Sequence, residues 1–197
     1  RRGIGGRSEE VSGAKMLAVA DRECRLRERV YLGGAYALLT FEHAEIARAQ
    51  PGQFAMIQPL VSPDLILRRP FSIMDTDPAT DRFTIFLKAV GPGSAAVFHM
   101  EEGEKARVLG PLGRGFTPPA SGERVFLVGG GYGVAPFALF SRGLRDASID
   151  FRLFYGGRNA RELPLTSELE RRRIPLTLST DDGTRGEMQV KKGDRVL

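Results

Sequence analysis

Two short segments of the sequence carry residue types that can bind a nucleotide. The first is ERVFLVGGGYGVAP, residues 123–136. Its apolar run Val125–Val128 predicts a short buried strand of a parallel sheet and precedes four glycines within five residues. A strand that ends in such a turn and continues into a helix brings free N–H groups and a positive helix end to one point, which favours a phosphate or pyrophosphate. An ordinary tight turn has the same pattern, because no Gly-Lys-Ser/Thr follows and Pro136 stands where Gly-x-Gly-x-x-Gly has its third glycine.

The second segment is Arg69-Pro70-Phe71-Ser72. The arginine fork can bind a pyrophosphate, an aromatic ring can stack on a flat heterocycle, and a serine hydroxyl can hydrogen-bond a ring nitrogen. By itself this segment is also an ordinary strand, since phenylalanine is commonly a core residue. Lys88, Gly93 and Ser94 add a charge and a glycine-preceded helix start, and the combined set predicts a dinucleotide site.

Other kinds of catalytic centre find no support in the sequence. Cys24 is the single cysteine, which excludes an internal disulfide and a four-thiolate cluster within this chain, and we expect it to be a buried thiol. His43 and His99 lie far apart with no Cys or His at metal-binding spacing, so no metal site is predicted. Ser141 lacks a Gly-x-Ser-x-Gly context, which argues against a serine hydrolase.

Composition narrows the class of protein further. The longest apolar runs fall well short of the roughly 18 residues that span a bilayer, and the start is rich in Arg and Gly, so a cytoplasmic protein is predicted. The net charge is +5, and residues 1–30, with eight basic and five acidic side chains, carry three of these charges. Because no basic stripe interleaved with aromatic residues follows, nucleic-acid binding is not favoured.

Short strands with turn signals between them occupy the first part of the chain. Residues 1–15 are polar, and we expect a disordered leader or a cloning remnant outside the fold. The predicted strands are residues 24–32 and 35–41, joined at Gly33-Gly34, followed by 51–59, 65–75, 82–90 and 105–109. Their spacing predicts an antiparallel barrel over residues 16–117. A short helix is expected at 94–103, with Ser94 as its N-cap and Gly103 as its stop.

Strands and helices alternate after the Gly- and Pro-rich boundary segment 110–122. We expect strands at 125–128, 151–155 and 175–180 and helices at 136–144 and 165–173, which form a parallel α/β lobe over residues 118–197. Ligands of such sheets sit beyond the carboxyl ends of the strands. Residues 129–133, 156–159 and 180–183 all follow strand ends and can line one crevice.

Four motifs in this order, RPFS, FLKAVGPGS, GPLGRGF and VGGGYGVAP, resemble those of the ferredoxin-reductase-type flavoproteins. Within that family they are most similar to the electron-transfer subunit of bacterial class 1B dihydroorotate dehydrogenase, over about residues 24–186. The resemblance implies a barrel that binds FAD and an α/β lobe that binds NAD(H). Phe71 stands where the wider family has tyrosine, which keeps an aromatic ring but removes a hydroxyl.

The resemblance also implies the residues of both sites. Arg69 would contact the flavin phosphates, Phe71 would stack on the ring system, and Ser72, as the catalytic residue, would hydrogen-bond it. The predicted FAD site comprises Arg69, Pro70, Phe71, Ser72, Phe86, Leu87, Lys88, Gly93 and Ser94. The predicted nucleotide site comprises Gly130, Gly131, Gly133, Pro136, Gly156, Arg158, Thr180, Asp181 and Asp182. Asp181 and Asp182 could accept hydrogen bonds from ribose hydroxyls, whereas Arg158 could bind a 2′-phosphate. We expect NADH as the substrate, because the proteins that this chain resembles use NADH.

We therefore expect hydride to pass between NAD(H) and FAD, and electrons to continue to a dihydroorotate dehydrogenase catalytic subunit in pyrimidine biosynthesis. A free-standing NAD(P)H-dependent flavin or ferredoxin reductase is the alternative enzyme, and a non-catalytic interaction module is the alternative of another class. The close relatives also carry a [2Fe–2S] cluster on four cysteines near the C-terminus, which Cys24 alone cannot supply. Since three parallel strands leave a sheet edge open, we expect the printed sequence to be incomplete at its C-terminal end.

Overall fold

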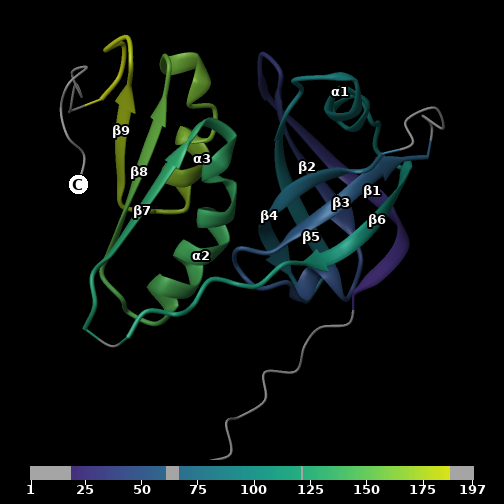
Figure 1. Ribbon diagram of the computed structural model, residues 1–197, viewed down its shortest axis with the longest axis horizontal. Coiled ribbons are helices and arrows are strands. Elements are labelled where there is room, and N and C mark those ends of the chain that lie inside the picture. The colour runs from purple at the N-terminus through teal and green to yellow at the C-terminus, as the bar shows by residue number, and fades with distance from the viewer. Residues whose placement is uncertain (1–18, 61–66, 121, 187–197) are drawn as a thin grey trace, which may run out of the picture.

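The computed structural model describes residues 19–60, 67–120 and 122–186. Its first part is a closed antiparallel barrel and its second a three-stranded parallel sheet with helices, so the predicted fold class is confirmed (Figure 1). The barrel strands are β1 (Ala20–Gly33), β2 (Tyr36–Glu42), β3 (Phe54–Pro59), β4 (Arg69–Asp77), β5 (Arg82–Lys88) and β6 (Lys105–Leu112). The expected leader, residues 1–15, lies outside the described residues, as does the end of the chain from residue 187.

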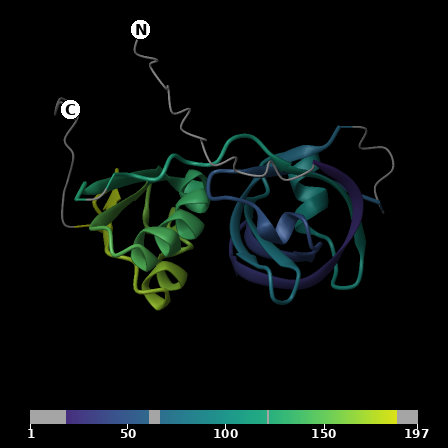
Figure 2. The same cartoon turned by 90° about the horizontal axis from the view of Figure 1, so that it is seen from below.

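The barrel strands are ordered β1-β2-β5-β4-β3-β6 and close on themselves, as the view from below shows (Figure 2). The predicted hairpin between β1 and β2 is confirmed: Gly33 pairs with Tyr36, and Gly33 and Gly34 have φ of 96° and 56°, which favour glycine. Alternate residues of each strand fill the interior, where Phe41 and Phe83 stack with ring centroids 5.6 Å apart. A packed interior leaves ligand binding to the outside of the barrel.

Two predicted elements of the barrel have different bounds. Strand β4 begins at Arg69 and runs to Asp77, so Leu67 and Arg68 precede it. Helix α1 spans Pro92–Phe98, and the predictions of Ser94 as its N-cap and Gly103 as its stop are wrong. Gly91 is the N-cap, because Pro92 has its backbone preset for the first helical position. The Ser94 hydroxyl instead accepts hydrogen bonds from the N–H groups of Val90 (2.9 Å) and Gly91 (3.1 Å).

The α/β lobe (residues 125–186) has the strand order β7-β8-β9, all parallel. Its elements are β7 (Val125–Gly130), the 3-10 helix Gly131–Val134, α2 (Ala135–Asp146), β8 (Phe151–Gly157), the 3-10 helix Ala160–Glu162, α3 (Thr166–Arg171) and β9 (Leu176–Thr180). The prediction that Val125–Val128 is a buried strand is wrong for one face of β7, since Phe126 and Val128 are 59% and 73% exposed. Helices α2 and α3 lie on the same face of the sheet, and no described element covers the other (Figure 1).

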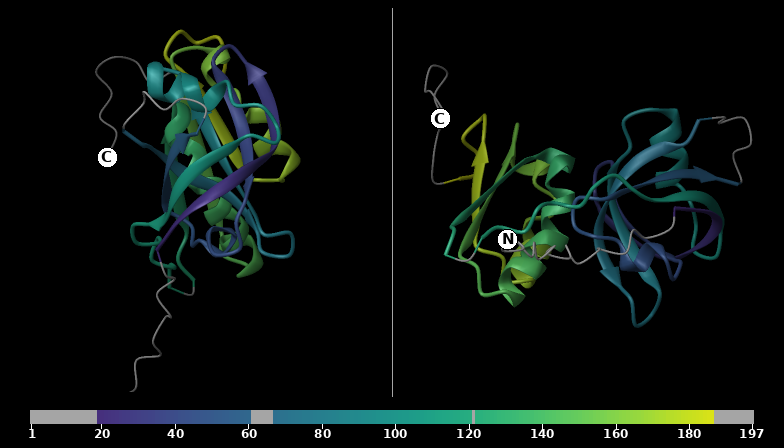
Figure 3. Two further views of the ribbon diagram at one scale, coloured as in Figure 1. Left: turned by 90° about the vertical axis from the view of Figure 1, so that its right-hand side faces the viewer. Right: turned by 60° about the horizontal axis from the view of Figure 1, so that its bottom comes forward.

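The two lobes share an apolar and charged junction. Helix α2 lies between the sheet and the barrel and packs on β4, as Figure 1 and the right-hand view of Figure 3 show. Met74 of β4 is buried among side chains of the α/β lobe, and Leu139 of α2 is buried among those of the barrel. Asp75 accepts hydrogen bonds from Arg142 at 2.6 Å and Arg172 at 2.7 Å. These contacts position the glycine turn after β7 against the barrel.

Candidate functional site

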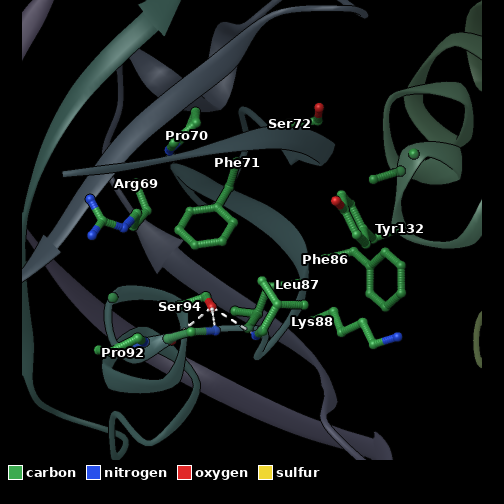
Figure 4. A pocket seen from close by; sticks show the side chains of 15 residues that line it. Arg69, Pro70, Phe71, Ser72, Phe86, Leu87, Lys88, Pro92, Ser94 and Tyr132 are labelled. Atoms are coloured by element: carbon green, nitrogen blue, oxygen red, sulfur yellow. Dashed lines mark hydrogen bonds between the residues drawn. The ribbon is translucent and has the colours of Figure 1, made fainter.

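A cavity of about 450 Å³, here called the barrel pocket, lies where β4, β5 and the start of α1 face the glycine turn (Figure 4). It collects all nine residues of the predicted FAD site, together with Gly133 from the other lobe. Its full lining is Arg69, Pro70, Phe71, Ser72, Phe86, Leu87, Lys88, Val90, Gly91, Pro92, Gly93, Ser94, Tyr132, Gly133 and Ala135. Its volume is typical of pockets for cofactor-sized ligands.

One end of the barrel pocket is suited to an anionic group. The Arg69 guanidinium donates to the backbone carbonyls of Leu67 (3.2 Å) and Arg68 (3.4 Å), and within the described residues it contacts no carboxylate. Gly93 of α1 allows it to approach, because a Cβ there would lie 2.3 Å from Arg69 Nε. A guanidinium without an acidic partner keeps its bidentate fork available for a phosphate.

The other end of the barrel pocket is aromatic (Figure 4). Phe86 and Tyr132 present rings there, and Phe71 lies between that end and Arg69. Tyr36 stacks behind Phe86 with ring centroids 5.7 Å apart and planes 12° apart. No described residue hydrogen-bonds the Ser72 hydroxyl, which therefore can donate to a ring nitrogen or accept from a ring N–H. Flat apolar walls with a hydroxyl beside them fit a fused heterocycle. The phosphate-binding groups at the far end of the pocket fit a phosphate chain attached to that heterocycle.

A second cavity, of about 320 Å³, lies at the carboxyl ends of β7, β8 and β9 and is here called the strand-end pocket. It is lined by Gly130, Gly131, Gly156, Gly157, Arg158, Glu162, Ser179 and Asp181, five of which belong to the predicted nucleotide site. This is the position at which open α/β sheets bind nucleotides. Gly130 and Gly131 expose backbone there, beside the start of α2.

Glu162 links the strand-end pocket to the barrel pocket. Its carboxylate accepts from Arg158 in a fork (2.7 and 3.2 Å) and from Lys88 of β5 (3.0 Å). The hydrogen bonds from Arg158 and Lys88 lower the pKa of Glu162 from 4.5 to about 2. One carboxylate thus holds an arginine of one pocket and a lysine of the other, which ties the second pocket to the barrel.

This bridge predicts a specific pH dependence. Because the folded-state pKa of Glu162 is lowered from 4.5 to about 2, its contribution to stability is complete above pH 4.5 and is lost as the pH falls toward 2. We expect a side-chain carboxyl resonance of Glu162 to titrate near pH 2 by NMR. In the variant Lys88→Met the midpoint is expected to rise toward the ordinary value, and a Glu162 midpoint near 4.5 in the unsubstituted protein would contradict the geometry.

Three residues of the predicted nucleotide site line neither pocket. Pro136 belongs to the first turn of α2. Thr180 is buried and exchanges hydrogen bonds with the backbone of Arg185 at 2.8 and 3.0 Å, while Asp182 accepts from the backbone and hydroxyl of Thr184. Because these side chains have partners within their own loop, the structure gives them a local role.

Among the pocket residues that the sequence did not predict, Tyr132 and Glu162 have the side chains most suited to a role in the site. Tyr132 is the one large side chain within Gly129–Gly133. A single aromatic residue among glycines indicates a ring that projects from a turn whose other residues leave the backbone accessible. Glu162 lies four residues after Arg158, the spacing of a charge pair, but its contact with Lys88 depends on how the lobes pack.

Gly131 is predicted to be essential for the strand-end pocket. Its φ is +52°, and no atom of the described residues lies within 4 Å of the place a Cβ would occupy, so the backbone angle and not space demands glycine. We expect Gly131→Val to weaken NAD⁺ binding about tenfold or more while FAD binding stays within about threefold, since a β-branched residue resists this angle. Equilibrium titrations with each ligand measure both values.

The matched control for that variant is Gly131→Asn, because asparagine tolerates positive φ and the surrounding space is open. It is expected to bind NAD⁺ nearly as the unsubstituted protein does. Normal NAD⁺ affinity in a folded Gly131→Val protein would show that the turn does not form the nucleotide site.

Comparison with known proteins identifies relatives of this chain. The chain is 30% identical over 149 residues to the dihydroorotate dehydrogenase B (NAD(+)) electron transfer subunit of Desulforamulus reducens, covering 75% of this chain and 57% of the relative. It is 32% identical over 144 residues to that of Listeria monocytogenes, covering 72% and 56%. This chain is a homologue of these electron-transfer subunits. The resemblance that the four motifs predict is confirmed.

Solved structures agree on the fold. The NADH-dependent reduced ferredoxin–NADP oxidoreductase superimposes with a TM-score of 0.74 at 25% identity, covering 85% of this chain and 59% of that one. The ferredoxin reductase of carbazole 1,9a-dioxygenase gives a TM-score of 0.75 at 21% identity, over 85% of this chain and 53% of that one. No family model matches the sequence. The chain spans little more than half the length of the Desulforamulus and Listeria homologues.

Within residues 19–60, 67–120 and 122–186, no helix is long and apolar enough to cross a bilayer. In the same ranges no three His, Cys, Asp or Glu side chains gather so as to hold a metal ion. Cys24 is buried in the barrel, as expected, and burial raises the pKa of its thiol to about 12.

Proposed function

We propose that this chain is an electron-transfer flavoprotein that binds FAD in the barrel pocket and NAD(H) in the strand-end pocket. The observation that carries the proposal is that one turn serves both cavities: Gly130 and Gly131 line the strand-end pocket, while Tyr132 and Gly133 line the barrel pocket. A nucleotide bound by this turn is therefore adjacent to a ring bound in the barrel. Such adjacency is what hydride transfer between two cofactors requires.

The residues present fit a flavin. Arg69 and the start of α1 suit the pyrophosphate, Phe71 and Phe86 suit the faces of the ring system, and Ser72 suits a polar ring atom. A flavin held there supplies the redox chemistry, and the protein's own part is to orient the ring and exclude water from it. The predicted roles of Arg69, Phe71 and Ser72 belong to this proposal.

The strand-end pocket favours NADH over NADPH. Arg158 donates two hydrogen bonds to Glu162, so a 2′-phosphate could bind Arg158 only by breaking these bonds. A second carboxylate, Asp181, lines the same pocket and would repel the phosphate. Asp181 can accept hydrogen bonds from ribose hydroxyls instead. The names of the relatives, which specify NAD(+), agree with this preference.

The proposed destination of the electrons is a dihydroorotate dehydrogenase catalytic subunit, by homology with subunits of that name. A [2Fe–2S] cluster would need cysteines that this sequence lacks, because Cys24 is its one cysteine. A cytoplasmic location stays a prediction from the sequence.

Two experiments test the proposal and separate it from its alternatives. Titration with FAD is expected to give a yellow complex of one flavin per chain, and a chain that binds no FAD would be the non-catalytic module. Co-expression with a dihydroorotate dehydrogenase catalytic subunit, followed by affinity capture, is expected to recover both chains. Capture of this chain alone, still reducible by NADH, would instead support a free-standing reductase.

A further inference from the structure

A further cavity, of about 300 Å³, lies beside the junction of the two lobes, between β4 and the C-terminal ends of α2 and α3. We propose that this cavity, here called the arginine cavity, binds the phosphate group of a small phosphate monoester. The proposal is independent of both cofactors, because the arginine cavity shares no described lining residue with the barrel pocket or the strand-end pocket.

Basic side chains outnumber acidic ones around the arginine cavity. Its charged lining residues are Arg142, Arg145, Arg171, Arg172 and Asp75. Asp75 accepts hydrogen bonds from Arg142 and Arg172, as described above. Glu168 adds a second carboxylate, which accepts from Arg171 at 2.6 Å and from Arg172 at 2.7 Å. Four guanidinium cations and two carboxylates leave a surplus of two positive charges at this place.

Arg145 carries the least compensated of these charges. Within the described residues its guanidinium hydrogen-bonds the backbone carbonyl of Arg172 and no carboxylate. It follows Arg142 by three residues on α2, so the two cations are neighbours on the helix surface and repel each other. A helix C-terminus favours cations in its last turn, but this explains only Arg145 and Arg171. A bound anion would offset the remaining repulsion.

The surplus charge and the shape of the arginine cavity favour a phosphate monoester. Such a group carries a charge of about −1.5 to −2 at pH 7 and has three acceptor oxygens, whereas a carboxylate carries one charge and has two oxygens. Guanidinium groups bind phosphate oxygens through paired N–H donors. The apolar part of the described lining is Ala138 and Ile174, which offer no flat wall for an aromatic ring. The ligand is therefore recognised by its phosphate and has a small organic part.

The arginine cavity is separated from the barrel pocket along α2. Ala135, at the start of this helix, lines the barrel pocket, and Arg145 lies ten residues further along, which is about 15 Å at 1.5 Å per residue. A ligand in one cavity can therefore be distinguished from a ligand in the other by the residues whose NMR signals it shifts.

The test is a titration of the protein with glycerol 3-phosphate, followed by the backbone amide signals in NMR at neutral pH. Chloride keeps the ionic strength constant, and glycerol and acetate serve as the uncharged and the singly charged ligand. The variant Arg145→Gln removes the cation that has no described carboxylate partner. The matched control is Arg173→Gln, because Arg173 is an exposed arginine beside Arg172 that lines none of the three cavities.

We expect glycerol 3-phosphate to shift the signals of residues 142–146 and 171–174 in a saturable way, acetate to bind more weakly and glycerol to have no effect. Arg145→Gln is expected to raise the Kd for glycerol 3-phosphate about ten- to a hundredfold, the range for loss of one charge-assisted hydrogen bond. Arg173→Gln is expected to change it by less than about threefold. No saturable shift at these residues, or the same Kd in both variants, would overturn the inference. Because the titration needs neither FAD nor NADH, these outcomes leave the proposed function untouched.

Discussion

Replacement of Arg69 with alanine is expected to raise the Kd for FAD about ten- to a hundredfold, because a hydrogen bond to a charged group contributes about 1.5–3 kcal/mol. Within the described residues the Arg69 guanidinium hydrogen-bonds only two backbone carbonyls, at 3.2 and 3.4 Å, so its charge is available to a ligand. The Arg69→Ala substitution is expected to leave the barrel folded, because Arg69 lines a cavity and is not part of the hydrophobic core. Isothermal titration with FAD measures the change.

The neighbouring Arg68 provides the matched control. Its guanidinium donates to Asp21 at 2.8 Å and does not line the barrel pocket, so Arg68→Ala removes the same charge from the same strand region. It is expected to leave the Kd for FAD within about threefold, which is less than 1 kcal/mol. Equal losses in the two variants would show that net charge and not the Arg69 fork retains FAD.

Replacement of Asp75 with alanine is expected to lower the free energy of unfolding by about 1–3 kcal/mol and to loosen the junction between the lobes. Its carboxylate accepts from Arg142 at 2.6 Å and from Arg172 at 2.7 Å, and both arginines belong to the α/β lobe. The change leaves two partly buried cations without this partner. The expected loss of unfolding free energy lies between the values for exposed and buried ion pairs, because the Asp75 side chain is 22% exposed.

Urea unfolding measures the stability of this variant, and limited proteolysis of segment 113–120 reports the junction. Asp77→Ala is the control, since Asp77 is exposed on the same strand and bonds only Ala79 and Thr80 of its own turn among the described residues. The control is expected to leave the proteolysis rate unchanged. If the free energy of unfolding of Asp75→Ala lies within about 0.5 kcal/mol of that of the unsubstituted protein, the role assigned to the ion pairs of Asp75 is contradicted.

Elements with a strong local signal were predictable from the sequence. The hairpin at Gly33-Gly34 follows from two residues that accept positive φ, and the turn after β7 follows from the glycines at 129–133. The nine residues of the predicted FAD site could be grouped in advance because they come from two adjacent strands and the start of the helix that follows them. Local chemistry is sufficient where the chain itself brings the groups together.

The remaining features depend on packing between distant segments. The apolar run Val125–Val128 gives no indication that one of its faces stays exposed, since that depends on which side the helices take. Ser94 has the residue type of an N-cap, yet Pro92 moves the helix start to Gly91. Lys88 and Glu162 are 74 residues apart, so no spacing rule could have linked the two pockets through them.

Anaerobic mixing of the FAD-loaded protein with NADH tests the central claim most directly. The account predicts that NADH bleaches the visible absorbance of the flavin, while FAD-loaded Gly131→Val is bleached about tenfold or more slowly at the same subsaturating NADH concentration, because its nucleotide turn is distorted. A protein that binds FAD in the barrel pocket but remains fully oxidised with NADH would contradict the claim that one turn brings the two cofactors together.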